Sequence, residues 1–390
     1  MTRISISVPV VRWALERSGR RARLERRFPK LPEWLSGESQ PTLRQLEDLA
    51  KATSTPLGYF FLSEPPEEQL PIPHFRTLGD GRSVGPSPDL LETVQAMERR
   101  QAWMREYLIE EGHGPLDFVG SASATKEPTV EPEQLAIEMR RMLGLVEGWA
   151  AGNRTWTDAL RQLRGRMEEA GILVVVNGVV GNNTRRKLDP AEFRGFVLVD
   201  EYAPLVFVNG ADGKAAQMFT LAHELAHVWF GSSAAFDLRE LQPADDRTEL
   251  ACNRAAAEFL VPKSQLLEFW PSAEKREEQE PYQAAARHFK VSELVVVRRA
   301  VDLGLITKRD YLDFYRGYQR EERVAAASQG QGGGDFYANQ NLRIGRRFAE
   351  VVVGAAREGR LLYRDAYQLT GLYGKTFERY AQSLAAGGAP

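Results

Sequence analysis

The chain has 390 residues, of which 43% are hydrophobic and 27% are charged, and its formal net charge is −2. At about 150 residues per domain, this length predicts two to four folded units. No apolar stretch approaches the ~20 residues that a membrane span needs, and the short apolar patch near the N-terminus lacks the features of a secretory signal. The single cysteine, Cys252, excludes an internal disulfide and fits a reducing compartment, so we expect a cytoplasmic protein without membrane contact.

The first thirty residues are strongly basic. Nine Lys or Arg residues stand there against Glu16 and Glu25. The nearly neutral whole chain gives no general sign of nucleic-acid binding, but a local basic block can attract phosphate groups. The alternative is a solvated helix face, which has the same composition. The basic residues are Arg3, Arg12, Arg17, Arg20, Arg21, Arg23, Arg26, Arg27 and Lys30.

Helices dominate the structure expected before residue 131. One is expected at 9–27, one from Thr42 onward and one at 88–111. Thr42 is a residue type that caps helix N-termini, and leucines follow it at helical spacing. An aromatic cluster at 56–61 closes this first unit, and the proline-rich residues 64–88 indicate a linker.

Residues 131–270 alternate between helix and strand patterns. The expected elements are helices at Glu133–Leu143 and Thr157–Ala170, strands at 172–176, 193–200 and 205–209, and helices at 215–230 and 244–260. Gly171 suits the end of the second helix. Only four residues separate the last two strands, which indicates a hairpin. The order predicts an α+β fold, with helices packed on a small, mostly antiparallel sheet.

These patterns divide the chain into six segments. They are a small helical domain (1–70), a linker and helix (71–130), the α+β domain (131–270), a helical subdomain (271–325), a Gly-rich flexible break (326–334) and a helical C-terminal region (335–390).

Candidate chemistry concentrates in the run His223-Glu224-Leu225-Ala226-His227. Residues four apart share a helix face, so His223 and His227 can direct two imidazoles at one metal ion, and Glu224 can reach a water beside it. The surrounding residues are apolar, and ionisable groups in a buried helix are costly unless they are paired or bound to metal. Imidazole suits Zn²⁺, so the run predicts a zinc site. The alternative is a pair of satisfied core histidines beside a surface glutamate.

A third protein ligand is expected from the helix at 244–260. Glu249 lies twenty-two residues after His227, and Asn253 follows one turn later on the same face. We therefore predict that Glu249 completes the metal site and that Asn253 hydrogen-bonds a ligand histidine. The alternative for Glu249 is an ordinary exposed helix carboxylate.

Other side chains compete for the third position. Asp245 and Asp246 are rival carboxylates, and so is Glu258. Glu258 lies about half a turn out of phase with Glu249 on a 3.6-residue helix, so it should point elsewhere. Cys252 is expected to be a small buried filler and not a ligand.

The set of motifs resembles the ImmA/IrrE metallopeptidases. The similarity rests on His223–His227, on Glu249-x-x-x-Asn253, and on Ala256 with Leu260-Val261-Pro262. It extends across most of the chain. The further similar segments are 34–43 and 56–62, which resemble an N-terminal XRE-type helix-turn-helix unit often fused to such peptidases, then 75–77, 291–306 and 334–348.

The resemblance implies a zincin-like domain of the gluzincin type. By that resemblance His223, His227 and Glu249 hold Zn²⁺ (Mn²⁺ in vitro), and Glu224 is the general base. It also implies a protein substrate, because the members that are understood cut a partner helix-turn-helix repressor and release its target genes. Zinc peptidases commonly bind substrate as an added strand, and one strand within 196–208 would serve.

The N-terminal unit differs from a functional DNA-binding helix-turn-helix domain. Pro29 and Pro32 fall where the second and third helices should run, and proline inside a helix costs about 3 kcal/mol. A recognition helix that starts at Leu31 would accommodate Pro32 in its first turn. The basic residues lie mostly on the first helix, which does not read the groove in this motif. Two interpretations of residues 1–62 therefore remain. Either they contact DNA, or they form a module that holds a protein partner or packs on the peptidase.

The sequence supports two functions of different classes. The first is a regulatory zinc endopeptidase that cleaves a repressor or antitoxin-like protein. The second is a DNA-binding transcriptional regulator or antitoxin, with a PIN-like nuclease toxin as its partner and a secondary or inactive peptidase site. A purely structural zinc site is a third reading, although three ligands beside a glutamate resemble an open catalytic site. The sequence leaves open the oligomeric state and whether segment 178–187 covers the site.

Overall fold

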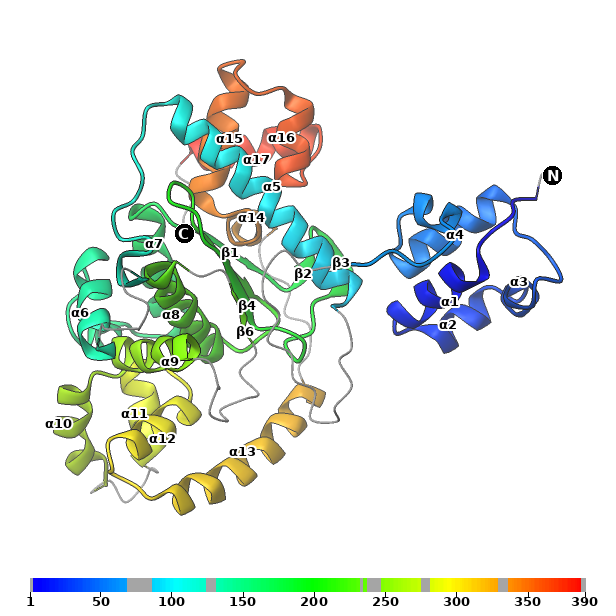
Figure 1. Cartoon of the computed structure of the whole chain (residues 1–390). Coiled ribbons are helices and arrows are strands. Elements are labelled where there is room, and N and C mark those ends of the chain that lie inside the picture. The colour runs from blue at the N-terminus through cyan, green and yellow to red at the C-terminus, as the bar shows by residue number, and fades with distance from the viewer. Residues whose placement is uncertain are drawn as a thin grey trace. The chain divides into compact units, whose positions relative to one another are not determined.

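A computed structural model describes seven stretches of the chain, namely residues 3–68, 86–123, 131–231, 234–236, 247–274, 281–328 and 336–386. The chain divides into two compact units, Met1–Pro71 with Arg76–Gln95, and Ile72–Phe75 with Ala96–Pro390. Figure 1 labels their helices and strands. Three predicted features lie wholly or largely outside the described residues: the proline-rich linker, the rival ligands Asp245 and Asp246, and the Gly-rich break.

The first unit is helical. Its elements are α1 (Val8–Arg17), α2 (Arg21–Arg27), α3 (Leu31–Ser36), α4 (Leu43–Thr53), the 3₁₀ turn η1 (Leu57–Phe61) and the first residues of α5 (Pro88–Glu110), which continues into the second unit. The predicted single helix at 9–27 is wrong, because the chain breaks between α1 and α2. Gly19 adopts a φ of 61°, a left-handed conformation that ends a helix and that glycine adopts without steric cost.

Capping and proline placement explain the other boundaries of this unit. Thr42 is confirmed as an N-cap. Its hydroxyl accepts a hydrogen bond from the backbone N–H of Gln45, and the side-chain oxygen of Gln45 accepts one from the backbone N–H of Thr42. Pro29 lies in the turn before α3, and Pro32 lies in the first turn of α3, where the missing N–H costs nothing. The helices enclose a small core that includes Val11, Leu31, Trp34, Leu49 and Phe60.

The second unit contains a four-stranded sheet in the order β1-β5-β4-β6. Its strands are β1 (Leu173–Asn177), β5 (Leu205–Asn209), β4 (Gly195–Leu198) and β6 (Ala234–Phe236). β1 and β5 run parallel, whereas the β4–β5 and β4–β6 pairs are antiparallel, so the small, mostly antiparallel sheet is confirmed. A separate hairpin of β2 (Val179–Val180) and β3 (Asn183–Lys187), which the sequence patterns did not indicate, lies between β1 and β4 in the chain.

Helices surround the sheet. Those that precede it are α6 (Pro132–Met142) and α7 (Trp156–Glu169), with the short turns η2 (Ser121–Ser123) and η3 (Trp149–Gly152). Those that follow β5 are α8 (Lys214–Phe230), α9 (Arg247–Leu260), α10 (Lys263–Glu274), α11 (Pro281–Phe289), α12 (Glu293–Asp302) and α13 (Lys308–Ser328). The helices predicted at 133–143, 157–170 and 215–230 are thereby confirmed, and the one predicted at 244–260 is confirmed from Arg247 onward.

The two faces of the sheet pack differently. Alternate residues such as Val197 and Val206 belong to the main core with α6, α7, α8 and α9. The neighbouring positions Phe196 and Phe207 stack on the other face with ring centroids 4.8 Å apart. On α5, the Gln101 side-chain amide donates to the carbonyls of Leu198 and Ala203, at 2.7 and 3.0 Å, which fastens α5 to the β4–β5 hairpin.

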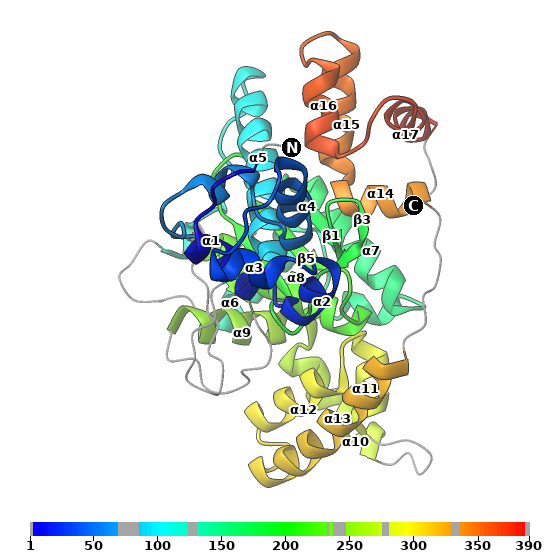
Figure 2. The same cartoon turned by 90° about the vertical axis from the view of Figure 1, so that its right-hand side faces the viewer.

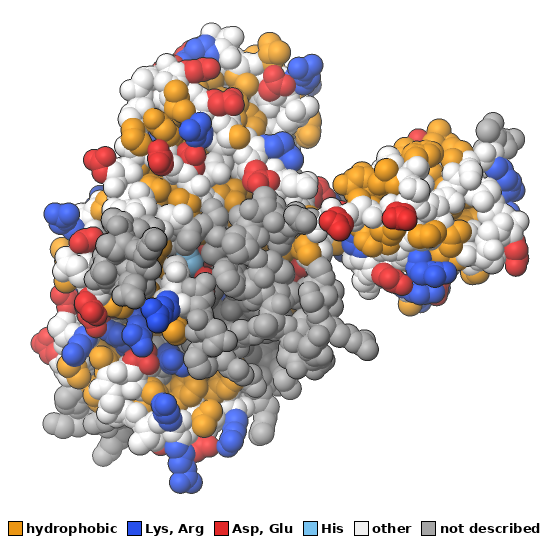
Figure 3. Space-filling model, viewed as in Figure 1, with side chains coloured by type: hydrophobic (Ala, Val, Ile, Leu, Met, Phe, Trp, Pro, Cys, Tyr) orange, Lys and Arg blue, Asp and Glu red, His pale blue; other side chains and the backbone are white. Residues whose placement is uncertain are grey.

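The C-terminal region is helical, as predicted. It comprises α14 (Phe336–Ile344), α15 (Arg346–Arg357), α16 (Tyr363–Thr370) and α17 (Lys375–Ala385). No helix in the described stretches is long and apolar enough to cross a membrane. On the face drawn in Figure 3, acidic and basic side chains are interspersed, in keeping with the small net charge.

Candidate metal centre

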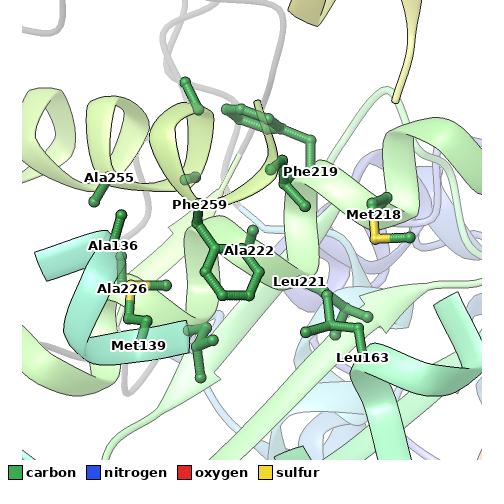
Figure 4. Close-up of a cluster of buried hydrophobic side chains, with 14 of the residues drawn as sticks. Ala136, Met139, Leu163, Met218, Phe219, Leu221, Ala222, Ala226, Ala255 and Phe259 are labelled. Carbon is green, nitrogen blue, oxygen red and sulfur yellow. The ribbon is translucent and has the colours of Figure 1, made fainter. Parts of the chain in front are cut away.

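The site is built on α8, which is the most buried helix of the second unit. Every side chain from Gln217 to Phe230 is buried, and the helix ends where Gly231 turns left-handed with a φ of 67°. Figure 4 shows the apolar packing around this helix. The labelled neighbours are Ala136 and Met139 of α6, Leu163 of α7, Ala255 and Phe259 of α9, and Met218, Phe219, Leu221, Ala222 and Ala226 of α8 itself.

Three donors from α8 and α9 converge on one point. The Nε2 atoms of His223 and His227 are 3.0 Å apart. Glu249, in the first turn of α9, places its two carboxylate oxygens 3.3 Å from the His223 Nε2 and 3.2 Å from the His227 Nε2. The structure therefore brings together the three residues that the sequence predicted as ligands, and all three are buried.

The spacing of these donors fits a tetrahedral metal ion. With metal–ligand distances near 2.0–2.2 Å, two donors on a tetrahedral zinc lie roughly 3.3 Å apart. The two Nε2 atoms are 3.0 Å apart, and the Nε2 atoms of His223 and His227 lie 3.3 and 3.2 Å from different oxygens of Glu249. With one donor atom from each residue, the three donors lie within 4.8 Å of one another. Two imidazoles and one carboxylate match the three-ligand set of catalytic zinc sites, which leaves the fourth position for water or substrate. The donor set and its geometry are thus compatible with zinc.

Charge and burial set the protonation of these groups. Burial lowers the pKa of His223 to about 4, partly opposed by its hydrogen bond to Glu249, so the ring is neutral at pH 7. Burial raises the pKa of Glu249, but the hydrogen bonds from His223 and His227 outweigh it and hold the pKa well below its usual range. Neutral imidazoles and an ionised carboxylate are the forms that bind a metal ion.

Glu224 differs from Glu249 in having no hydrogen-bond partner among the residues that the structure describes. Its side chain is fully buried, and within the described stretches neither carboxylate oxygen has a hydrogen-bond partner. Burial raises its pKa well above the ordinary value, and the negative charge of Glu249 raises it further. A buried, unpaired carboxyl group one residue from a metal ligand is suited to taking and returning a proton near neutral pH.

The remaining predicted residues have distinct positions. Asn253 lies one turn beyond Glu249 on α9, and its side chain is within hydrogen-bonding reach of the His223 ring. Glu258 forms a buried ion pair with Arg299 of α12 and accepts from the Lys263 amide, so it points away from the histidines as its phase on the helix predicted. Cys252 is a buried part of the core.

One residue near the site, Gly195, was not predicted from the sequence. Gly195, at the start of β4, lies against α8 so closely that a Cβ there would be 2.5 Å from the Thr220 Cγ2, 2.8 Å from the Phe207 carbonyl oxygen and 3.4 Å from the Glu224 Oε1. The available signal was a glycine inside a strand pattern, which often marks a close backbone approach. Because Gly195 has no side chain, the start of β4 can lie beside the Glu224 carboxylate.

Comparison with protein families supports this assignment. Residues 167–301 match the model of a peptidase family, M78, described as the IrrE N-terminal-like domain. Residues 344–383 match a family described as a domain of unknown function. No curated protein and no solved structure matches the chain. The first match extends from the end of α7 to the end of α12, includes all the residues of the candidate metal centre and indicates a metallopeptidase domain.

Proposed function

We propose that the second unit is a zinc-dependent endopeptidase of the IrrE type, with His223, His227 and Glu249 as ligands and Glu224 as the catalytic base. The observation that carries this proposal is the buried convergence of three metal donors beside a carboxylate that lacks any partner in the described part of the chain. The family match at 167–301 supports it independently. A purely structural metal site has no use for the unpaired, buried Glu224, because such a group is costly to bury.

The reaction proposed is hydrolysis of a peptide bond. A bound Zn²⁺ would supply Lewis-acid polarisation of the scissile carbonyl and would lower the pKa of the attacking water. Glu224 accepts a proton from that water as its oxygen bonds to the carbonyl carbon. Glu224 then returns the proton to the departing amine as the C–N bond breaks. Asn253, through the His223 ring, holds that imidazole in the orientation that its ligand role needs.

We further propose that the substrate binds as an extended strand at the β4–β6 edge of the sheet. β5 lies between β1 and β4, and β4 lies between β5 and β6, so in the described sheet neither strand has a free edge, and the expectation that a strand within 196–208 would receive the substrate is wrong. The outer strand on the β4 side is β6. The start of β4 also lies near the Glu224 Oε1, since a Cβ on Gly195 would be 3.4 Å from that atom. An added strand would gain main-chain hydrogen bonds along this edge.

The proposed substrate is a partner protein, a helix-turn-helix repressor or an antitoxin-like protein, as the family resemblance implies. The test incubates the purified chain and Zn²⁺ with such proteins encoded beside its gene, comparing the wild type with Glu224→Gln. Loss of a general base should slow cleavage by about 10²–10⁴-fold while bound zinc stays unchanged. Glu133→Gln, at an exposed position on α6, is the matched control and should cleave normally. Equal cleavage by the wild type and Glu224→Gln would exclude the proposal.

A second candidate function is DNA binding by the first unit. The observation that favours it is the exposure of Arg23, Arg26, Arg27 and Lys30 on α2 and the turn after it. The six-residue helix α3, in contrast, presents no basic side chain, so these charges suit contact with phosphates more than reading of bases. A gel shift with the chain's own promoter and a salt titration tests this role, and absence of binding at low salt contradicts it.

A further inference from the structure

The last two helices form a helix-turn-helix pair that the proposed peptidase activity does not use. α16 ends at Gly371, which adopts a left-handed φ of 69°, and α17 begins at Lys375 after only four residues. A short turn with glycine between two steeply crossed helices is the geometry of DNA-reading helix-turn-helix units. In Figure 2, α15 and α16 lie lengthwise in the view, whereas α17 is seen nearly along its axis, so α17 crosses them at a large angle.

Burial divides this pair into an inner and an outer face. Thr370, Leu372, Phe377 and Tyr380 are each no more than 3% exposed, and they hold the pair together. The ring of Phe377 packs edge-on against Tyr367 of α16, with centroids 5.2 Å apart. The opposite face of α17 is polar and exposed. Its exposed polar residues are Lys375, Thr376, Glu378, Arg379 and Gln382, and Ala385 at the end of the helix is exposed as well. The second helix of the pair thus presents an unpacked polar face, as a recognition helix must.

A basic hairpin touches the turn that leads into α17. Asn182, at the tip of the β2–β3 hairpin, donates from its side-chain amide to the Gly371 carbonyl at 3.0 Å. The register of the hairpin pairs Val180 with Asn183 and Val179 with Lys187, so residues 184–186 bulge out of the ladder. A bulge changes the direction in which side chains point, and the bulged residues here include Arg185 and Arg186.

Basic side chains are present both on the hairpin and on α17. The hairpin contributes the exposed Arg185 and Lys187 and the half-buried Arg186, and α17 contributes Lys375 and Arg379. The acidic side chain on this exposed face of α17 is Glu378. The Asn182–Gly371 hydrogen bond joins a hairpin with three cations to the turn before a helix with two, although these segments are almost 190 residues apart in the sequence, and cations gathered in this way complement a phosphate backbone.

We propose that this surface, which we call the C-terminal basic corner (Arg185–Lys187 with Lys375 and Arg379), binds double-stranded DNA. α17 enters the major groove, and the hairpin contacts the neighbouring phosphates. This site is separate from residues 1–62 and does not depend on the peptidase chemistry. A duplex is favoured over a protein partner because the exposed face of α17 is polar, with two cations against one carboxylate, and the adjoining hairpin adds three cations, whereas a protein-docking helix presents apolar anchors.

Fluorescence anisotropy with a labelled duplex of about thirty base pairs tests the proposal on the full chain, between 50 and 300 mM salt. The variants are Lys375→Gln/Arg379→Gln and Arg185→Gln/Lys187→Gln. Each should weaken binding at least about tenfold at 100 mM salt, and each should lower the slope of log K against log salt by about 2, because two phosphate contacts are lost. Unchanged bound zinc and an unchanged thermal unfolding curve show that the variants fold.

Two matched variants make the test decisive. Arg141→Gln/Lys308→Gln removes two exposed cations elsewhere in the second unit, and Arg23→Gln/Arg26→Gln removes two from α2. Binding close to that of the wild type in the first control supports the proposal. The proposal is overturned if that control weakens binding as much as the corner variants, if only the α2 variant loses binding, or if the wild type fails to bind the duplex at 50 mM salt.

Discussion

Gly195 and Glu224 lie opposite each other where the first residue of β4 meets the middle of α8. A Cβ on Gly195 would come 3.4 Å from the Glu224 Oε1, and it would also meet Thr220 and the Phe207 carbonyl at distances that real atoms do not tolerate. The spacing between the sheet and α8 is therefore set by the absence of one side chain. This relationship leads to the first prediction.

Gly195→Ala should push β4 away from α8, because the added methyl group would come 2.5 Å from the Thr220 Cγ2 of α8. We expect a loss of about 1–3 kcal/mol in the free energy of unfolding, as for other overpacked cores, and a fall in peptidase activity with zinc retained. Thr220→Ser removes the nearer obstacle, Cγ2, and keeps the hydroxyl that donates to the Ala216 carbonyl, so it should rescue the variant in part. Gly165→Ala on α7, where a Cβ meets nothing within 4 Å, is the control and should not destabilise. Full activity of Gly195→Ala would contradict this account.

Loss of a metal ligand should remove the ion and weaken the fold together. We expect His223→Ala and Glu249→Ala to bind no zinc by elemental analysis, whereas Glu224→Gln binds it normally. A ligand present at a hundred times its Kd stabilises a fold by about 2.7 kcal/mol, so a chelator should lower the melting temperature of the wild type by several degrees. The same chelator should leave the melting temperature of His223→Ala unchanged. Full zinc occupancy in Glu249→Ala would show that the third ligand is assigned wrongly.

Arg100 should be essential for attaching the C-terminal helices to α5. Its buried guanidinium donates to the carbonyls of Arg343 and Leu369, both at 2.9 Å, at the ends of α14 and α16. Burial lowers its pKa to about 10, so the group is still charged at neutral pH. Arg100→Met keeps the volume and leaves these carbonyls without a donor, which should cost about 1–3 kcal/mol in urea unfolding. Hydrogen exchange should accelerate in α14 and α16. Arg99→Met, one position away and exposed, should have neither effect.

The ion pair between Glu258 and Arg299 should be strongly coupled. Both side chains are buried, and the pair joins α9 to α12 beside the Arg140 guanidinium, which donates to the Glu258 carbonyl at 2.8 Å. Removing one partner leaves a buried charge without compensation, so Arg299→Met alone should cost about 3–5 kcal/mol. Arg299→Met/Glu258→Gln should cost clearly less than the sum of the single variants. Arg298→Met is the control, because its side chain is 39% exposed and its pair with Asp302 contributes little. Additive losses in the double variant would rule out the coupling.

The sequence was sufficient wherever a local pattern determines structure. Helical spacing placed His223 and His227 on one face, and the phase of α9 separated Glu249 from Glu258. The β4–β5 hairpin followed from two apolar runs separated by a short turn. These features need only the neighbouring residues, so periodicity and turn chemistry were enough.

What the sequence could not show depends on contacts between distant segments. The β2–β3 hairpin carries the polar run Asn183–Lys187, in which no apolar residue alternates, so no strand pattern exists there. Arg100 sits in an amphipathic helix where an arginine suggests solvent, and its burial follows from helices more than 240 residues later. The break after α1 rests on a single glycine, a weaker signal than the helical composition around it.

The burial of α8 has a consequence for the life of the protein in the cell. The helix that supplies two of the three metal donors is also the centre of the main core, so a metal ion held there would bind only the folded chain. Under the proposed assignment, metal supply and protein abundance are then linked. When zinc is scarce, a larger fraction of molecules is unfolded at any moment and exposed to proteolysis, so the protein would be cleared by degradation before it accumulated as an inactive apo form.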